Sequence, residues 1–170
     1  PDIDPGERAS CDYLLATLAV QNHSADADDR LQRALVSLEG SPGPQAACDR
    51  ATLQAIRGLN AVRDGDLRLA DSLSRAAPRP GCGSDSLVFW TRAQVAGQRG
   101  ELDAAERAYG EAIAQGGQYV PLQQLELARL LHTHAPNDPR VRALAAAAEP
   151  ELRRQNLPAE AAEAARLAAP

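Results

Sequence analysis

The sequence contains no lysine, because all 18 of the cationic side chains among its 170 residues are arginines. The missing amine excludes the lysine of a P-loop, the lysine of a kinase and the lysine that forms a Schiff base with a carbonyl substrate. Methionine is missing as well, and the chain starts with Pro-Asp-Ile-Asp-Pro. We therefore expect a processed or trimmed segment whose leader or anchor has been removed.

Aromatic residues and long apolar runs are also scarce. The chain has one Trp, three Tyr and one Phe, so we expect a core of small, closely packed side chains. No apolar run reaches about eighteen residues, which predicts that this segment neither spans nor contacts a membrane. The net charge of −5 provides no basic surface for nucleic acid.

Motifs of catalysis and metal binding are missing too. The sequence has no C-x-x-C pair, no nucleophile elbow, no H-E-x-x-H and no glycine-rich phosphate loop. His132 and His134 are two positions apart, which places their rings on different sides of a helix. We predict that the chain is not an enzyme and that it takes no cofactor and no metal.

Alanine and leucine dominate what is present, with 35 and 22 residues. Their excess over valine and isoleucine favours helix over strand. The abundance of Ala, Arg, Gly and Pro without lysine is typical of a GC-rich bacterial genome. Glycine and proline clusters divide the chain into segments of helical periodicity, and each segment has the length of two helices. The expected helices are 7–22, 26–39, 46–63, 66–77, 85–98, 101–115, 119–134 and 139–149, with Pro150 beginning another piece and a tail helix at 158–168.

Comparing the sequence with itself reveals an offset of 35 residues. Gly65 aligns with Gly100, each followed by an acidic residue, and small residues upstream and downstream also coincide. Glycine suits the left-handed end of one helix, and an acidic residue suits the start of the next.

The segment from Ser86 to Gly117 carries a fuller pattern. Small and aromatic residues recur at fixed places in it: Phe89, Ala93, Ala96, Ala105, Tyr109 and Ala112, around the Gly100-Glu101 turn. This pattern resembles a tetratricopeptide repeat, with weaker copies at 9–38, 52–78 and 121–149. The resemblance implies an all-α, tetratricopeptide-like α-solenoid that forms one domain over 1–170, with units 7–39, 46–77, 85–115 and 119–149 and the tail helix. The alternative is an irregular, alanine-rich helical bundle.

The resemblance also implies a binding surface, since the first helix of each repeat lines the concave groove of such arrays. Carried onto matching positions, this rule gives the partner-binding residues Arg63, Trp90, Gln94, Gln98, Arg129 and His132, with Leu59, Val62 and Leu125 beside them. Trp90 would be an exposed anchor and Phe89 the buried aromatic. Amides can bond an extended backbone, and arginines can pair with carboxylates, so we expect a protein or peptide segment of acidic character.

The three cysteines allow one disulfide. Cys48 opens a predicted hairpin and Cys82 follows its close, so a Cys48–Cys82 bridge is favoured slightly over Cys11–Cys48. The remaining alternative is that the cysteines form no disulfide and are buried or unreactive thiols.

The expected function is a non-enzymatic protein–protein interaction scaffold or assembly adaptor of a bacterial envelope system. It would be periplasmic or envelope-associated, with the cytoplasm as the other option. The alternatives are a partner-recruiting accessory domain of a larger enzyme, such as an envelope polysaccharide-synthesis or glycosyl-transfer protein, and an oligomerisation module.

Overall fold

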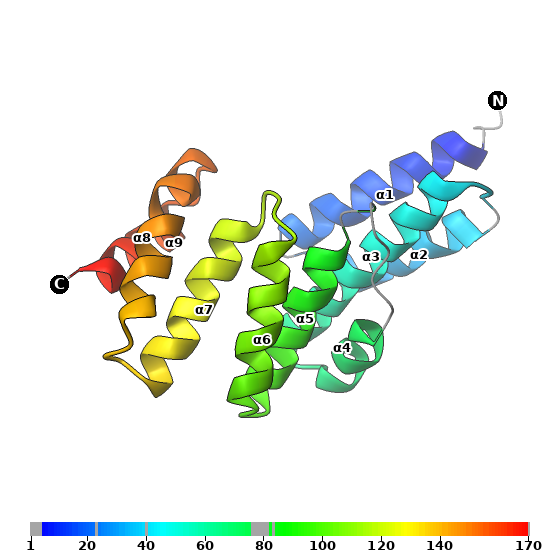
Figure 1. Ribbon diagram of the computed structural model, residues 1–170. Helices are drawn as coiled ribbons and strands as arrows, with labels where there is room; N and C mark the ends of the chain where they lie inside the picture. Colours follow the sequence, from blue (N-terminus) through cyan, green and yellow to red (C-terminus); the bar gives the residue numbers. More distant parts are fainter. Residues whose placement is uncertain (1–4, 23, 40, 76–81, 83, 170) are drawn as a thin grey trace.

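The computed structural model describes residues 5–22, 24–39, 41–75, 82 and 84–169, and every regular element in these ranges is a helix. The prediction of an all-α fold is therefore confirmed. None of the helices in the described ranges has the length and apolar character needed to cross a bilayer. The helices (Figure 1) are α1 Pro5–Gln21, α2 Ala27–Glu39, α3 Pro44–Arg63, α4 Leu67–Ser74, α5 Asp85–Gln98, α6 Leu102–Ala114, α7 Val120–His134, α8 Pro139–Arg154 and α9 Pro158–Ala168.

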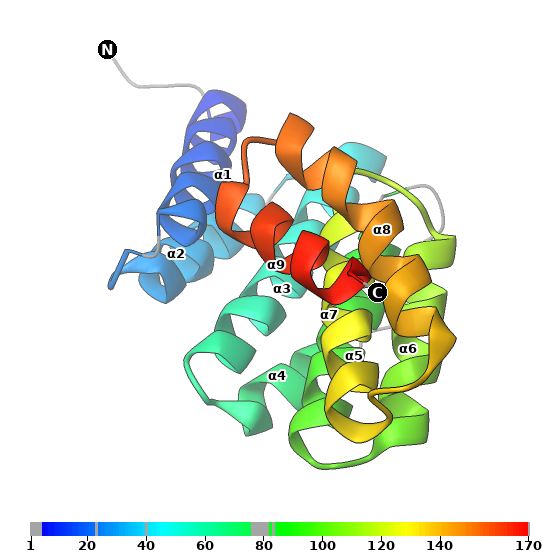
Figure 2. The same ribbon diagram turned by 90° about the vertical axis from the view of Figure 1, so that its left-hand side faces the viewer.

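Helices that are neighbours in the chain pack against each other. Thus α1 pairs with α2, α3 with α4, α5 with α6 and α7 with α8, while α9 packs on α8. Three further contacts join alternate helices: α1 with α3, α3 with α5 and α7 with α9. The helices therefore follow one another across the molecule, with α1 and α2 at one end and α8 and α9 at the other (Figures 1 and 2).

Gly65 and Gly100 end helices α3 and α5 in the same way. The backbone angle φ is +80° at Gly65 and +76° at Gly100, in the left-handed region that suits glycine. The amide after each glycine donates a 2.9 Å hydrogen bond, to the carbonyl of Ala61 in the first turn and of Ala96 in the second. This is the Schellman arrangement, so the offset of 35 residues in the sequence corresponds to two equivalent turns.

Small residues lie where helices cross. Ala93 of α5 and both Ala105 and Ala112 of α6 are fully buried. Gly58 brings α3 close to α5, since a Cβ added there would lie 3.0 Å from Cγ2 of Thr91. The fold thus uses alanine and glycine to bring helix backbones together, as the scarcity of aromatic residues suggests.

The buried apolar side chains form three clusters. The main one extends from α5 to α9 and includes Leu125 and Leu152, both fully buried. A second joins α1, α2 and the start of α3 around Leu31 and Leu53. A small third cluster lies between α3, α4 and α5.

Two helix ends differ from the prediction by three or more residues. Helix α8 does not stop at 149 but runs through Pro150 to Arg154. Proline removes one backbone hydrogen bond there, but the continued helix buries Leu152 completely. Helix α4 ends at Ser74, and the rest of the helix expected at 66–77 lies mostly outside the described residues.

Candidate functional site

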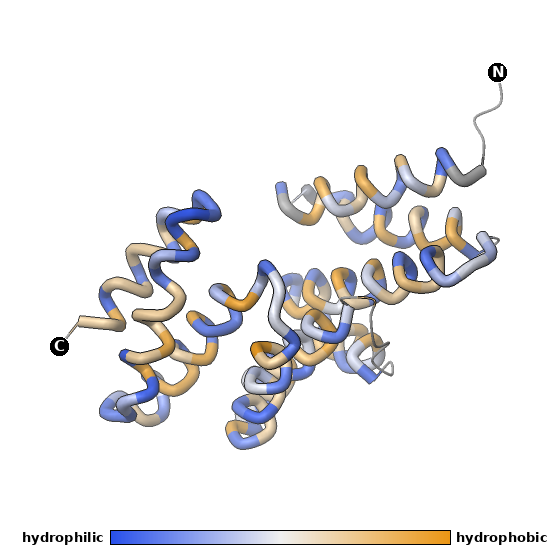
Figure 3. The backbone as a smooth tube through the Cα atoms, turned by 45° about the horizontal axis from the view of Figure 1, so that its top comes forward, coloured by the Kyte–Doolittle hydropathy of each residue, from blue (hydrophilic) through white to orange (hydrophobic). Residues whose placement is uncertain are grey.

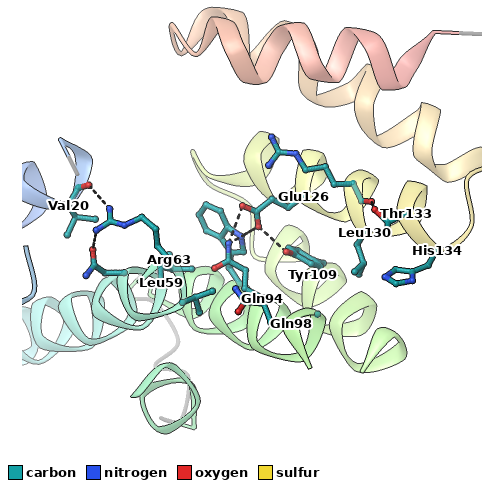
Figure 4. Close-up of a pocket in the computed structure, with 15 residues that line it drawn as sticks. Val20, Leu59, Arg63, Gln94, Gln98, Tyr109, Glu126, Leu130, Thr133 and His134 are labelled. Atoms are coloured by element: carbon teal, nitrogen blue, oxygen red, sulfur yellow. Dashed lines mark hydrogen bonds between the residues drawn. The ribbon is translucent and has the colours of Figure 1, made fainter. Parts of the chain in front are cut away.

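An open groove of about 650 Å³ lies against α3, α5 and α7 (Figure 4). Its lining comes from the first helices of the four pairs, α1, α3, α5 and α7, except for Tyr109 of α6. The groove is lined by Val20, Leu59, Asn60, Val62, Arg63, Trp90, Gln94, Gly97, Gln98, Tyr109, Glu126, Arg129, Leu130, Thr133 and His134.

Five of the six residues expected at the partner-binding surface line this groove. They come from three helices that are far apart in the sequence: Arg63 from α3, Trp90, Gln94 and Gln98 from α5, and Arg129 from α7. Leu59 and Val62, expected beside them, line it too. Leu125 was wrongly placed there, because it is fully buried in the main core.

His132 is the sixth expected residue, and it lies outside the groove. It is exposed on α7, whereas His134, two positions later, is among the lining residues. Two positions on a helix differ by about 200° of rotation, so the two rings cannot share a face. The groove histidine is therefore His134.

Glu126 holds the floor of the groove together. Its carboxylate accepts hydrogen bonds from Trp90 Nε1 at 2.5 Å, from Tyr109 Oη at 2.9 Å and from Gln94 Nε2 at 2.9 and 3.1 Å. These donors come from α5 and α6, so a single side chain of α7 links three helices (Figure 4). Burial, and next the charge of Glu126, raise the pKa of the Tyr109 phenol, which therefore stays a donor at neutral pH.

Trp90 is not the exposed anchor that the sequence suggests. Only 7 % of its surface is exposed, its ring lies 5.8 Å from that of Tyr119, and its indole N–H is bonded to Glu126. Phe89, expected to be the buried aromatic, is half-buried instead, with the Arg92 guanidinium 5.3 Å from its ring centre. Trp90 takes the interior position because a half-buried carboxylate is there to accept its N–H bond.

Arg63 joins α3 to the end of α1. Its guanidinium donates to Asn60 Oδ1 at 2.5 Å, to Asp64 Oδ1 at 3.3 Å and to the carbonyl of Val20 at 3.4 Å. The side chain is exposed, but its hydrogen-bonding groups are already engaged within the protein.

Arg129 is similarly engaged, with α9. Its Nε and Nη2 donate to the two carboxylate oxygens of Glu163 at 2.8 and 2.5 Å, a bidentate pair. The hydrogen bonds from Arg129 lower the pKa of Glu163, and burial opposes this shift only in part. The two arginines that were expected to attract an acidic segment thus have internal partners.

Two of the three cysteines form a disulfide, and the third is a free thiol. Cys48, in α3, is joined to Cys82 by a disulfide, with the two Cα atoms 4.9 Å apart. Cys11, on α1, is a free and exposed thiol. Within the described ranges, His, Cys, Asp and Glu side chains do not gather in groups of three or more that could hold a metal ion.

Glu126 is the site residue that the sequence analysis missed. It is the only carboxylate on α7, whose other charged side chain is Arg129. It also follows Trp90 by 36 residues, close to the repeat offset, and this spacing is the one signal that could have linked the two.

Similarity to known proteins gives no information about the groove. No protein-family model, no curated protein and no solved structure matches the chain. What the groove offers is an apolar wall of Leu59 and Leu130, two exposed side chains with free polar atoms in Gln98 and His134, and a central carboxylate. The leucines can pack against an apolar group, and the amide and the imidazole can form hydrogen bonds.

Proposed function

We propose that this chain is a non-enzymatic protein-interaction module that binds an extended segment of a partner in the groove. The observation that carries the proposal is the convergence of Arg63, Gln94, Gln98 and Arg129 on one open cleft. These residues come from three separate first helices, and the resemblance to a tetratricopeptide repeat predicts them as one group. A binding site assembled from successive units is what a groove-binding repeat array requires.

The proposed arrangement is a tetratricopeptide-like α-solenoid. In its support, first helices line the groove and the turns at Gly65 and Gly100 are equivalent. Among the described residues, the helices in close contact are neighbouring or alternate helices in the chain. An array of this kind presents its first helices on one side as a continuous surface for a peptide.

We propose a partner segment with an apolar side chain and free backbone amides rather than a strongly acidic one. An acidic segment would have to displace Glu163 from Arg129, and it would meet the Glu126 carboxylate at the centre of the groove. An apolar side chain can instead pack against Leu59 and Leu130, next to Gly97, where the wall has no side chain. Gln98 has an amide that can bond the backbone of the segment.

The module is proposed to act in an oxidising compartment such as the periplasm or another part of the bacterial envelope. The Cys48–Cys82 disulfide supports this location, because such bonds persist in oxidising compartments and are rare in the reducing cytosol.

A peptide-display selection tests the binding function. A random peptide library on phage is panned against the oxidised protein, and the affinity of enriched peptides is then measured for two variants. The groove variant combines Gln98→Ala with His134→Ala, two exposed lining side chains. The matched control combines Gln115→Ala with His132→Ala, the same residue types outside the groove.

We expect the groove variant to bind the selected peptides about tenfold more weakly, because interface side chains near an anchor dominate affinity. The control should bind like the parent, and all three proteins should unfold at the same temperature. Peptides that bind the groove variant and the parent equally, or a selection that enriches nothing, would overturn the proposal.

A further inference from the structure

Helix α1 has its apolar residues arranged the reverse way from an ordinary surface helix. It buries alanines, Ala9, Ala16 and Ala19, against α2 and α3, and it exposes leucines. The exposed fractions are 59 % for Leu14, 49 % for Leu15 and 50 % for Leu18. A helix that is apolar on both sides is normally covered on both sides. Within the described residues, α1 packs through its alanines and the half-buried Tyr13 and Val20, and its leucines are left exposed.

The exposure is concentrated in one place. Among the described residues, the exposed large hydrophobic side chains are these three leucines and Val36 of α2, which is 54 % exposed. Hydrophobic positions recur along α1 at the end of the molecule (Figure 3). At the opposite end, α9 buries its single leucine, Leu167. An apolar patch confined to one end marks an interaction surface.

Arginines border the apolar patch. Leu15 and Val36 line a hollow of about 410 Å³ together with Arg8 and Arg33. Both arginines are exposed, and within the described ranges no carboxylate lies in ion-pair distance of either. Arg33 donates instead to the backbone carbonyl of Asp29 at 3.4 Å. The nearby carboxylate of Asp12 is engaged by the Ser37 hydroxyl at 2.5 Å.

We propose that this α1–α2 face, formed by Leu14, Leu15, Leu18, Val36, Arg8 and Arg33, binds an amphipathic helix of another protein with acidic residues beside its apolar stripe. Leu18 lies four positions after Leu14 and three positions after Leu15. These are the spacings at which side chains share one side of a helix and pack against a second helix. Carboxylates on the flank of that helix would reach the two arginines, neither of which has a carboxylate in ion-pair distance among the described residues.

A second copy of this chain fits the face less well. In an antiparallel pairing of two α1 helices, Arg8 would lie against the end of the other α1, and residues 16–21 contain no carboxylate. In a parallel pairing, Arg8 would face Arg8. Either pairing buries the leucines, but neither sets a carboxylate of α1 directly opposite Arg8, so the charges favour a different, acidic chain.

Cys11 provides a direct measurement of occupancy. It is exposed one turn before Leu14 and Leu15, and it is a free thiol while Cys48 and Cys82 are joined. The probe is a synthetic helical peptide with a leucine stripe and glutamates on both flanks, and its matched isomer has lysines in place of the glutamates. The rate of Cys11 alkylation by iodoacetamide, followed by mass spectrometry, reports whether the face is covered.

We expect the glutamate peptide to slow alkylation about tenfold at saturation and the lysine peptide to leave it nearly unchanged, with added salt weakening the difference. The variant Arg8→Glu with Arg33→Glu should reverse the preference. The control Arg68→Glu with Arg107→Glu changes two exposed arginines on α4 and α6 and should keep it. Leu14→Ala with Leu18→Ala should abolish protection without changing the melting temperature, since both side chains are exposed.

Three results would overturn the proposal: no protection by either peptide, equal protection by both, or protection that rises with the concentration of the protein alone. The last would identify a second copy as the occupant. The groove variant of Gln98 and His134 should retain the peptide effect on Cys11, so this test and the groove test fail independently.

Discussion

Trp90 Nε1 donates a 2.5 Å hydrogen bond to Glu126 Oε2, which ties α5 to α7 beneath the groove. The same carboxylate also accepts from Tyr109 and Gln94. The floor of the proposed binding site is thus part of what holds the helices together. Variants meant to test binding should therefore avoid Glu126 and its donors and use the exposed side chains at the rim.

Replacing Glu126 by alanine should lower the free energy of unfolding by about 2 kcal/mol or more. The change leaves the buried N–H of Trp90 and O–H of Tyr109 without an acceptor, and each unsatisfied buried group costs roughly 1–3 kcal/mol. Glu126→Gln keeps one oxygen acceptor and should lose less. Urea denaturation followed by circular dichroism measures both, with the exposed Glu111→Ala as the control. Equal midpoints for Glu126→Ala and Glu111→Ala would show that the network contributes nothing.

The helices and the turns of this fold could be predicted from the sequence because they depend on local chemistry. The periodicity of alanine and leucine identifies the helices, and Gly65 and Gly100 each identify a helix end. The observed bounds differ from the predicted ones mainly at Pro150. Local preference predicts that the helix stops before this proline, but the helix continues to Arg154 and buries Leu152. The burial of Leu152 depends on contacts with other helices, and local sequence preference does not contain this information.

The close helix crossings give a second prediction. Ala105→Leu or Ala112→Leu should destabilise the protein by about 1–3 kcal/mol, because both positions are fully buried in α6 where it packs on α5. The matched control is Ala162→Leu, at an exposed position of α9. Thermal unfolding of the three variants measures the difference. A melting temperature of Ala105→Leu equal to that of Ala162→Leu would contradict the close packing.

Most of the predicted partner-binding residues do line the groove, but the sequence did not predict which of them are buried or already bonded to other side chains. A repeat rule is enough to assign Gln94 and Gln98 to the inner side. It cannot tell that Trp90 turns inward, since this depends on Glu126, 36 residues later in another helix. Nor can it tell that Arg129 is bound by Glu163 from α9, which lies beyond the repeats that the pattern compares.

Removing the disulfide should cost stability. Cys48 and Cys82 are 34 residues apart in the sequence, and closing a loop of that length restricts the unfolded chain by an amount worth about 3–4 kcal/mol. We expect Cys48→Ser to lower the urea midpoint accordingly, while Cys11→Ser, at an exposed free thiol, leaves it unchanged. Adding a reductant should bring the parent protein to the midpoint of Cys48→Ser and should not affect Cys48→Ser itself. A reductant-insensitive parent would contradict the bond.

The Arg129–Glu163 pair should make stability depend on pH in a defined direction. Hydrogen bonds from Arg129 lower the pKa of the Glu163 carboxyl below its ordinary value of about 4.3. A carboxyl whose pKa is lower in the folded than in the unfolded protein adds stability above its unfolded pKa, and this contribution is lost as the pH falls through the folded pKa. Both side chains are partly exposed to solvent, which screens the pair, so its full contribution should remain under about 1 kcal/mol.

We therefore expect Glu163→Gln to be slightly less stable than the parent at pH 7 and to become equally stable as the pH falls below about 4. High salt at pH 7 should also narrow the gap, because it screens an exposed ion pair. Urea unfolding at both pH values measures the gap, and Glu111→Gln, an exposed glutamate of α6, is the matched control. A gap that stays constant between pH 7 and the acidic range would mean that the loss comes from the packing of the Glu163 side chain and not from its charge.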